Sequence, residues 1–323
     1  MDIIRLIEDF HNAQPLALLW GLGGILALLV LGSLVAAMLT VVRPSKDYRE
    51  LRQRMSSWWV MVLLLAAALL AGWQATLALF AVVSFIALRE FLSLAPTRRE
   101  DRLIILGCYL TIPVSYAFVA ADIYGIYLVI IPVYAFLILP WLMAVIGQTK
   151  GYLSSVALFH WGLMTCVYNI GYAAFLMRTP ADQAPAGAAG LVFFLLVATE
   201  FNDVAQYVWG KLFGRHKIIP KVSPNKTWEG FLGGWASTAA LIWFVGPLFL
   251  PLGGIGLATL AVVLPVAGFA GDVTMSAIKR DIGVKDTSHL IPGHGGILDR
   301  IDSLTFTAPL YFHLLAWFSL AKF

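Results

Sequence analysis

The 323-residue sequence has few charged residues and few cysteines. Only 12% of the residues are Asp, Glu, Lys or Arg, whereas 60% are hydrophobic. A soluble globular domain carries about 25% charged residues, so this chain lacks the polar surface that such a domain needs in water. Its two cysteines, Cys108 and Cys166, lie inside apolar runs. This placement argues against a disulfide framework and predicts two small buried side chains.

The N-terminus lacks the pattern of a cleavable signal peptide. Asp2, Glu8 and Asp9 accompany a single cation, Arg5, and a basic stretch follows the first apolar run. The net charge of +4 is small, and the basic residues gather in short loops between apolar runs. We therefore expect membrane lipid, and no nucleic acid, as a partner.

Long hydrophobic runs are the dominant feature of the sequence. A helix needs about 20 apolar residues to cross the hydrocarbon core of a bilayer. This length predicts an all-α fold, a polytopic transmembrane helical bundle of about ten spans. The predicted spans cover residues 15–42, 56–73, 75–95, 103–121, 125–147, 152–176, 187–208, 231–249, 255–277 and 303–321.

Lys and Arg follow every second predicted span. They come after the first, third, fifth, seventh and ninth spans, and the first of these loops contains Arg43, Lys46 and Arg49. The loops between them carry almost no positive charge. The positive-inside rule therefore predicts basic loops in the cytoplasm and both termini outside. We expect an integral protein of a bacterial inner membrane.

Polar side chains form a stripe near the end of the seventh predicted span. Asp203, Tyr207 and Lys211 are spaced i, i+4 and i+8, which places them on one face of a helix, and Glu200 extends this face. An acid inside a transmembrane helix is costly and normally faces a wet cavity with a partner. The sequence therefore predicts a polar cavity that faces the cytoplasm.

A turn-like segment follows this stripe. Ser223 followed by Pro224 predicts a helix N-cap with proline at the first helical position. The free backbone N–H groups there, with Lys226 beside them, would bind an anion. An ordinary capped helix start explains the same pattern without a ligand.

A denser polar segment joins the ninth predicted span to the tenth. Asp272, Ser276 and Lys279 share one helical face, and His294 lies among glycines that let the backbone approach a ligand closely. Carboxylates hold Mg²⁺ beside substrate phosphates, and Lys and Arg neutralise the remaining phosphate oxygens. This inventory predicts phosphoryl or nucleotidyl transfer. A belt of paired charges at the membrane surface is the structural alternative.

The same segment reads Ser276-x-x-Lys279-Arg280, then Lys285-Asp286, then His294-Gly295-Gly296-x-x-Asp299-Arg300-x-Asp302. With this spacing it resembles the signature of the phosphatidate cytidylyltransferase (CDP-diacylglycerol synthase) family. Upstream segments resemble the family as well, and the match covers residues 60–320 roughly. The residues that carry the resemblance are Ala87-Leu88-Arg89-Glu90-Phe91, Asp203, Tyr207, Gly210-Lys211, Gly214, Ser223-Pro224-x-Lys226-Thr227-x-Glu229-Gly230, Ser276-x-x-Lys279-Arg280, Lys285-Asp286 and His294-Gly295-Gly296-x-x-Asp299-Arg300-x-Asp302.

The resemblance implies transfer of CMP from CTP to phosphatidic acid, with CDP-diacylglycerol and pyrophosphate as products. It also implies dependence on Mg²⁺, with K⁺ as an option for a second cation and a homodimer as an option for the assembly. It divides the chain into an N-terminal span with its basic cytoplasmic loop, residues 1–57, and a membrane-embedded cytidylyltransferase domain, residues 58–323. We expect the N-terminal part to be peripheral to the site.

The resemblance and the residue chemistry together assign three sets of candidate site residues. His294 is either a donor to phosphate or an organiser of its loop. The catalytic set neutralises the phosphates and contains Lys226, Lys279, Arg280, Lys285, His294 and Arg300. The substrate-binding set contains Tyr207, Lys211, Ser223, Asn225, Thr227, Ser276, Gly295 and Gly296. The metal set contains Asp203, Asp272, Asp299 and Asp302, of which Asp203 and Asp302 are a third ligand or partners of the ligands.

Two residues depart from the family pattern. Asn202 stands directly before Asp203, and Gln206 stands where the family has a small residue. A paralogue that acts on another phosphorylated lipid is therefore an alternative. An ion-coupled membrane transporter and a CTP-using lipid kinase are alternatives from other classes. We interpret His160 and His313, inside apolar spans, as structural residues.

Overall fold

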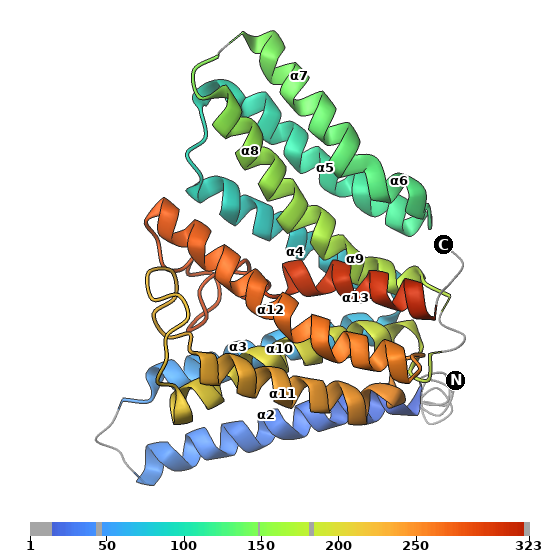
Figure 1. Ribbon diagram of the computed structural model, residues 1–323, viewed down its shortest axis with the longest axis vertical. Helices are drawn as coiled ribbons and strands as arrows, with labels where there is room; N and C mark the ends of the chain where they lie inside the picture. Colours follow the sequence, from blue (N-terminus) through green and yellow to red (C-terminus); the bar gives the residue numbers. More distant parts are fainter. Residues whose placement is uncertain (1–14, 43–46, 148, 181–183, 320–323) are drawn as a thin grey trace, which may run out of the picture.

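A computed structural model describes residues 15–42, 47–147, 149–180 and 184–319. Within these ranges the chain is helical and forms no β-strand, which confirms the all-α prediction for the described residues. Figure 1 shows the helices side by side in one bundle. The acids near the N-terminus, together with Arg43 and Lys46 of the first basic loop, lie outside the described residues.

Nine helical stretches of the described residues are long and apolar enough to cross a membrane. The tenth predicted span is a shorter apolar helix, α13 (Leu304–Phe318). The prediction of about ten apolar helices is therefore confirmed for the described residues, and the tenth helix is shorter than the predicted span. The nine stretches are α2 (Leu16–Val42), α3 (Arg49–Ala71), α4 (Trp73–Leu94), η1 (Arg99–Asp101) with α5 (Arg102–Ala120), α6 (Tyr124–Val129) with η2 (Ile130–Ala135) and α7 (Phe136–Ile146), α8 (Tyr152–Leu163) with η3 (Met164–Tyr168), α9 (Asn169–Phe175) and η4 (Leu176–Arg178), α10 (Gly187–Phe213), α11 (Trp228–Val245) with η5 (Gly246–Leu248), and α12 (Gly254–Ile282).

Side chains inside the apolar spans make the structural contacts that we expected. Cys108 and Cys166 are buried and free. The ring of His160 packs against Phe136 with centroids 4.9 Å apart, and His313 Nδ1 lies 3.4 Å from the hydroxyl of Tyr124. None of these residues lines the polar cavity described below.

Helices α10 and α11 approach each other closely because α11 carries glycines at the contact. A Cβ at Gly230 would lie 2.8 Å from the carbonyl oxygen of Gln206, and a Cβ at Gly234 would collide with the Gln206 side chain. Small residues allow helix backbones to pack in this way in membranes. The contact fixes the part of α10 that carries Asp203 and Gln206.

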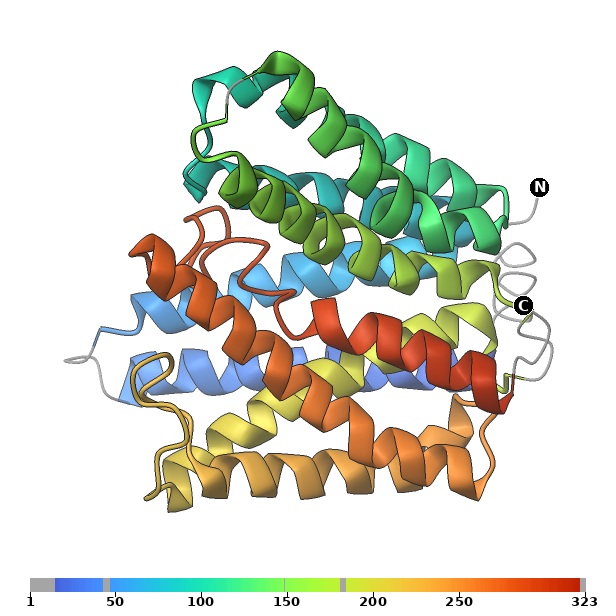
Figure 2. The same ribbon diagram turned by 45° about the horizontal axis from the view of Figure 1, so that its top comes forward.

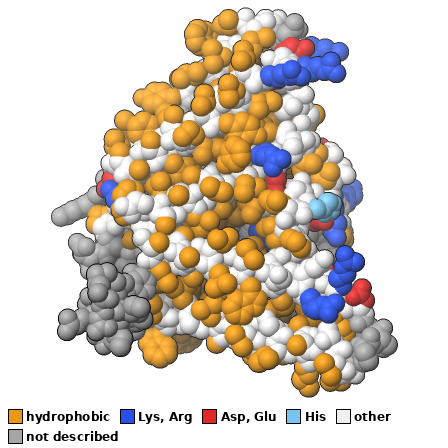
Figure 3. Space-filling model, turned by 180° about the vertical axis from the view of Figure 1, so that it is seen from behind, with side chains coloured by type: hydrophobic (Ala, Val, Ile, Leu, Met, Phe, Trp, Pro, Cys, Tyr) orange, Lys and Arg blue, Asp and Glu red, His pale blue; other side chains and the backbone are white. Residues whose placement is uncertain are grey.

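The charged loops share one end of the bundle. The loops after α4, α7, α10 and α12 lie at the left in Figures 1 and 2, whereas α2 begins and α13 ends at the right. Figure 3 shows most of the visible Lys and Arg side chains toward one side of the face, with hydrophobic side chains spread over the rest. Alternating loop charge predicts this arrangement. The long apolar helices identify an integral membrane protein.

Candidate active site

A cavity of about 480 Å³ lies between α10, α11 and α12 and the loop that leads to α13. We call it the inner cavity. It brings together most of the predicted site residues, which come from segments far apart in the sequence. Its predicted members are Asp203, Tyr207, Ser223, Asn225, Lys226, Thr227, Asp272, Lys279, His294, Asp299, Arg300 and Asp302.

Three acids in the inner cavity, Asp203, Asp272 and Asp302, form what we call the acid cluster. Lys226 Nζ lies 2.5 Å from Asp272 Oδ2 and donates a hydrogen bond to Gln206 Oε1 at 3.2 Å. Burial alone would lower the pKa of Lys226, but attraction to Asp272 and Asp203 outweighs it and raises that pKa. Lys226 therefore stays charged and serves as the counterion of the cluster.

The acid cluster contains three carboxyl groups, and Lys226 is the one cation that forms an ion pair with it among the described residues. Burial, followed by repulsion from Asp272 and Asp203, raises the pKa of Asp302 to about 8. Asp203 Oδ1 is buried and has no hydrogen-bond partner among the described residues. A buried carboxylate oxygen without a donor is costly, so the cluster is suited to a cationic ligand.

The chemistry of the acid cluster fits a hard cation such as Mg²⁺, which prefers oxygen ligands. The Lys226 ammonium is the positive partner of Asp272. Asp203 Oδ1 has no hydrogen-bond partner among the described residues and could therefore bind a cation. The described residues do not gather three or more His, Cys, Asp or Glu side chains as a preformed metal-binding group. Mg²⁺ and K⁺ at this site therefore stay predictions.

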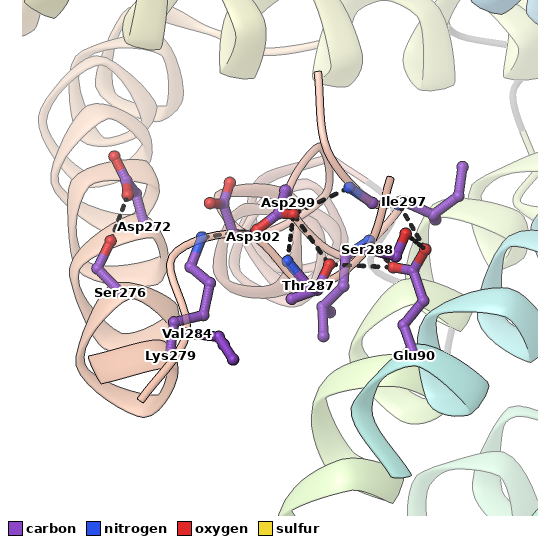
Figure 4. Close-up of polar contacts among 12 residues, drawn as sticks. Glu90, Asp272, Ser276, Lys279, Val284, Thr287, Ser288, Ile297, Asp299 and Asp302 are labelled. Carbon is purple, nitrogen blue, oxygen red and sulfur yellow. Dashed lines mark hydrogen bonds and ion pairs between the residues drawn. The ribbon is translucent and has the colours of Figure 1, made fainter. Parts of the chain in front are cut away.

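Asp299 differs from the acid cluster because its oxygens are already hydrogen-bonded. Lys279 Nζ lies 2.8 Å from Oδ1, and Oδ2 accepts from the backbone N–H groups of Thr287 at 2.7 Å and Gly296 at 2.9 Å, and from the Thr287 hydroxyl (Figure 4). Burial would raise the pKa of Asp299, but the bond from Lys279 and the backbone donors lower it. Asp299 is thus held as a carboxylate that organises its loop, and its predicted role as a metal ligand is untested.

Glu90 on α4 holds the same loop from the opposite side (Figure 4). Its Oε1 accepts from Ser288 Oγ at 2.7 Å and Ile297 N at 3.1 Å, and its Oε2 accepts from Leu298 N at 2.9 Å. The Thr287 hydroxyl lies within hydrogen-bonding distance of both Glu90 and Asp299. We call Glu90, Thr287 and Asp299 the loop clasp.

The sequence pattern places Glu90 within Ala87–Phe91 and assigns it no role in the site. The available signal was a carboxylate inside an apolar span, which normally requires buried partners. Gly296 explains part of the fit, because a Cβ there would collide with Thr287 Oγ1 and would leave no room beside Glu90. This glycine therefore supports the clasp through its size and its N–H, while the inner cavity is lined by other residues.

Several predicted residues lie outside the inner cavity. Arg280 is exposed and donates to the carbonyl oxygens of Val284 at 3.0 Å and Val222 at 3.4 Å, so it braces two loops. Lys211 is exposed beside the Tyr207 hydroxyl, at 3.4 Å. Ser276 Oγ donates to Asp272 Oδ1 at 3.2 Å and orients that acid. Lys285 and Gly295 line a neighbouring hollow.

The predicted N-cap at Ser223 is wrong. Helix α11 begins at Trp228, and its N-cap is Thr227, whose side chain accepts from Gly230 N at 3.2 Å. Ser223 instead begins a turn, in which its carbonyl accepts from Lys226 N at 3.2 Å. Proline at the second position of a turn is as favourable as proline at the start of a helix, so the sequence pattern suited both.

The N-terminal part of the chain also reaches the site. Arg54 and Trp58 of α3 line the inner cavity, and Ser57 Oγ donates to the carbonyl of Pro292 at 2.8 Å. The expectation that residues 1–57 are peripheral therefore fails for Arg54 and Ser57. The domain boundary after residue 57 stays a prediction.

Comparison with known proteins gives one family and several relatives. A family model described as "Cytidylyltransferase family" matches residues 52–318. A protein of Escherichia coli (strain K12) named "Uncharacterized protein YnbB" is 40% identical over 296 residues, which cover 92% of this chain and 97% of that protein.

Two relatives are named "Phosphatidate cytidylyltransferase". The protein from Brucella suis biovar 1 (strain 1330) is 37% identical over 146 residues, and the protein from Mycobacterium leprae (strain TN) is 43% identical over 121 residues. These alignments cover 45% and 37% of this chain, and 54% and 38% of the relatives. The chain thus matches about half or less of each of these two relatives.

Proposed function

Because the chain belongs to the cytidylyltransferase family, we propose that it transfers CMP from CTP to phosphatidic acid and releases CDP-diacylglycerol and pyrophosphate. The observation that carries this proposal is the inner cavity. Acids and cations from α3, α10 and α12, and from the loops before α11 and α13, meet there. Nucleotidyl transfer needs positioned substrates and neutralised phosphate charge, and this cavity offers both kinds of group.

In the proposed reaction a phosphate oxygen of the lipid attacks the α-phosphorus of CTP. A new P–O bond forms while the bond from the α-phosphorus to the oxygen that bridges to the β-phosphorus breaks. The electron pair leaves with pyrophosphate. A phosphate monoester is mostly ionised at pH 7, since its second pKa is about 6, so the attack requires no general base.

The cations of the cavity serve the charged substrates. Lys226, with its raised pKa, and Arg300 neutralise phosphate oxygens. Lys279 acts through Asp299, because its ammonium is bound there at 2.8 Å. The loop clasp fixes His294 and Arg300 relative to α12, so phosphates meet a preformed site.

Asp203, Asp272 and Asp302 are the residues that would hold Mg²⁺. A bound divalent cation would supply further neutralisation of the phosphate charge. Lys226 is the positive partner that the described residues provide for Asp272, and as a point charge on a flexible stem it can also pair with a phosphate oxygen in the inner cavity.

The membrane orientation follows from the same proposal. CTP is cytoplasmic, and the charged loops and the inner cavity share one end of the bundle. We propose that this end faces the cytoplasm of a bacterial inner membrane, with both termini on the outer side. A homodimer stays a prediction.

Label transfer from CTP tests the proposal. Purified protein in lipid nanodiscs would receive phosphatidic acid, Mg²⁺ and CTP labelled at either the α- or the γ-phosphorus. We expect α-label in the lipid and γ-label in released pyrophosphate. Label from the γ-position in the lipid would identify a kinase, and no lipid labelling with any phosphorylated lipid would refute the enzyme proposal.

A second candidate substrate is a different lipid phosphate monoester. Gln206 supports it, because its Oε1 accepts from Lys226 Nζ and its buried Nε2 has no partner among the described residues. The side-chain amide of Gln206 offers N–H donors to a bound acceptor lipid, which a small residue at this position would not. Competition between phosphatidic acid and lysophosphatidic acid, with wild type and Gln206→Ala, would show whether this amide selects the acceptor. A transporter lacks comparable support, since the charged residues that line the inner cavity belong to loops at one end of the bundle and to the helix segments beside those loops.

A further inference from the structure

A second hollow, of about 400 Å³, adjoins the inner cavity at the loop end of the bundle. We call it the outer hollow. The beginning of α3 and the loop between α12 and α13 form its walls. Arg54, Asp286, His294 and Arg300 line both spaces, so the inner cavity and the outer hollow meet at these four side chains.

Helix α3 is fitted to the loop at this junction. Ser57 Oγ donates to the Pro292 carbonyl at 2.8 Å, and the ring of Trp58 meets His294 edge to face at 5.9 Å. Gly293 has φ +76°, and a Cβ there would lie 2.9 Å from Arg54 Cγ. A glycine is therefore required both for the backbone conformation and for the approach of Arg54. These contacts place Arg54 at the junction as part of the fold.

The outer hollow offers more hydrogen-bond donors than its own acids use. Arg54, Lys285, His289 and Arg300 line it, and Arg300 Nε is buried without a partner among the described residues. Arg54 pairs with Glu50 at 2.6 Å, but both side chains are more than half exposed. An exposed pair of this kind contributes little, so an anionic ligand can take the place of Glu50.

The two spaces differ in the charge they favour. The inner cavity contains the acid cluster, which repels a free polyanion, whereas the outer hollow presents guanidinium and ammonium groups beside exposed loops. A guanidinium grips phosphate oxygens bidentately. We infer that the outer hollow binds the β- and γ-phosphates of the nucleotide and the pyrophosphate that leaves, and that Arg54 of α3 pairs with them. This inference rests on the proposed function.

The same chemistry would also recognise the phosphate of a lipid. The position of the outer hollow, between α3 and a loop at the end of the bundle, favours the water-soluble diphosphate. The experiment therefore compares the two sources. It uses the full chain in lipid nanodiscs and measures equilibrium binding of labelled inorganic pyrophosphate, in MgCl₂ and in EDTA, with CMP and dihexanoyl phosphatidic acid as further probes.

Arg54→Ala should weaken pyrophosphate binding about tenfold, the loss of one charge-assisted contact, and leave the affinities for CMP and for the short-chain lipid unchanged. Arg54→Lys should retain part of the affinity. Arg52→Ala removes an exposed cation from the same helix that lines neither space, and it should bind like the wild type. Glu50→Gln removes the competing carboxylate and should bind pyrophosphate more tightly.

Equal pyrophosphate affinity in wild type and Arg54→Ala, in both buffers, would overturn the inference. Weaker lipid binding with unchanged pyrophosphate binding would overturn it as well and would assign the hollow to the acceptor. Lipid labelling from CTP by the same wild-type preparation separates the two proposals. Its absence, with pyrophosphate binding still dependent on Arg54, would refute only the proposed function.

Discussion

The loop clasp and the acid cluster are both built from carboxylates, but Glu90 and Asp299 of the clasp are buried, whereas the three acids of the cluster are half-buried, and their hydrogen-bond partners differ as well. In the loop clasp, each oxygen of Glu90 and Asp299 accepts at least one hydrogen bond from a side chain or a backbone N–H. In the acid cluster, the ion pair between Lys226 and Asp272 is the one ion pair within 4 Å that the described residues provide.

This difference separates positioning from ligand binding. A carboxylate whose oxygens are filled holds backbone in place, and its removal leaves buried donors without partners. A carboxylate whose buried oxygen has no donor among the described residues, such as Asp203, is costly by itself and would gain a partner from a bound cation. Substitutions in the two groups should therefore change stability in opposite directions, while both reduce turnover.

The largest effect is expected for Asp299→Asn in the loop clasp. The amide would place a donor against Lys279 or the Thr287 backbone and leave a buried ammonium without its charge partner, which costs roughly 3–5 kcal/mol. Turnover should fall about 1,000-fold or more, and amide hydrogen exchange should rise over residues 286–302 while the helices stay protected. The exposed Asp281→Asn at the end of α12 is the matched control. Wild-type turnover in the Asp299 variant would contradict the role of the clasp.

Glu90→Ala should have the next largest effect. Donors on Ser288, Ile297 and Leu298 would lose their acceptor, with a loss of stability of roughly 3 kcal/mol and about a hundredfold loss of turnover. Glu90→Gln keeps one acceptor oxygen and should be affected less. Thermal unfolding and lipid labelling would measure both, with the exposed Glu100→Ala as control. If Glu90→Ala is as stable as the control, the clasp does not hold the loop.

Asp203→Asn should reduce turnover about a hundredfold without loss of stability. Its carboxyl group shares the acid cluster with Asp272 and Asp302, where each negative charge disfavours ionisation of the others, and the amide removes one of these groups. The midpoint of thermal unfolding should stay the same or rise in the absence of divalent ions, and MgCl₂ should stabilise the wild type more than the variant. A fall in the midpoint as large as that of Asp299→Asn would show that the two groups do not differ.

A smaller effect is expected from pH at the edge of the clasp. Burial first, and then the charges of Arg300 and Arg54, lower the pKa of His294 below its ordinary value of about 6.5. The folded protein therefore binds a proton less readily than the unfolded chain, so the stability contributed by the neutral His294 is complete above about pH 6.5 and is lost as pH falls below that value through the lowered pKa of the folded protein. His294→Asn should flatten the dependence of the unfolding midpoint between pH 7.5 and 5.5, whereas the exposed His289→Asn should not. Equal slopes for the two variants would remove His294 as the cause.

The sequence could predict the spans and most of the cavity, because each rests on local pattern. Apolar length gives the helices, and the i, i+4 spacing of Asp203 and Tyr207 gives a shared face. The clasp could not be predicted in this way, since Glu90 is separated by about 200 residues from the loop that it binds. Arg54 could not be predicted for the same reason, because the loop that it meets lies far along the chain. The turn at Ser223 could not be predicted for another reason, because Ser followed by Pro suits both a turn and a helix start.

Mass spectrometry of the lipid product would show whether the inner cavity attaches CMP to a phosphorylated lipid. Wild-type protein in nanodiscs, incubated with CTP, Mg²⁺ and phosphatidic acid, should yield a lipid heavier by one cytidylyl group, and Asp203→Asn should yield little of it. A product heavier by a single phosphate, or an unchanged lipid pool with every phosphate monoester supplied, would rule out transfer of CMP by this protein.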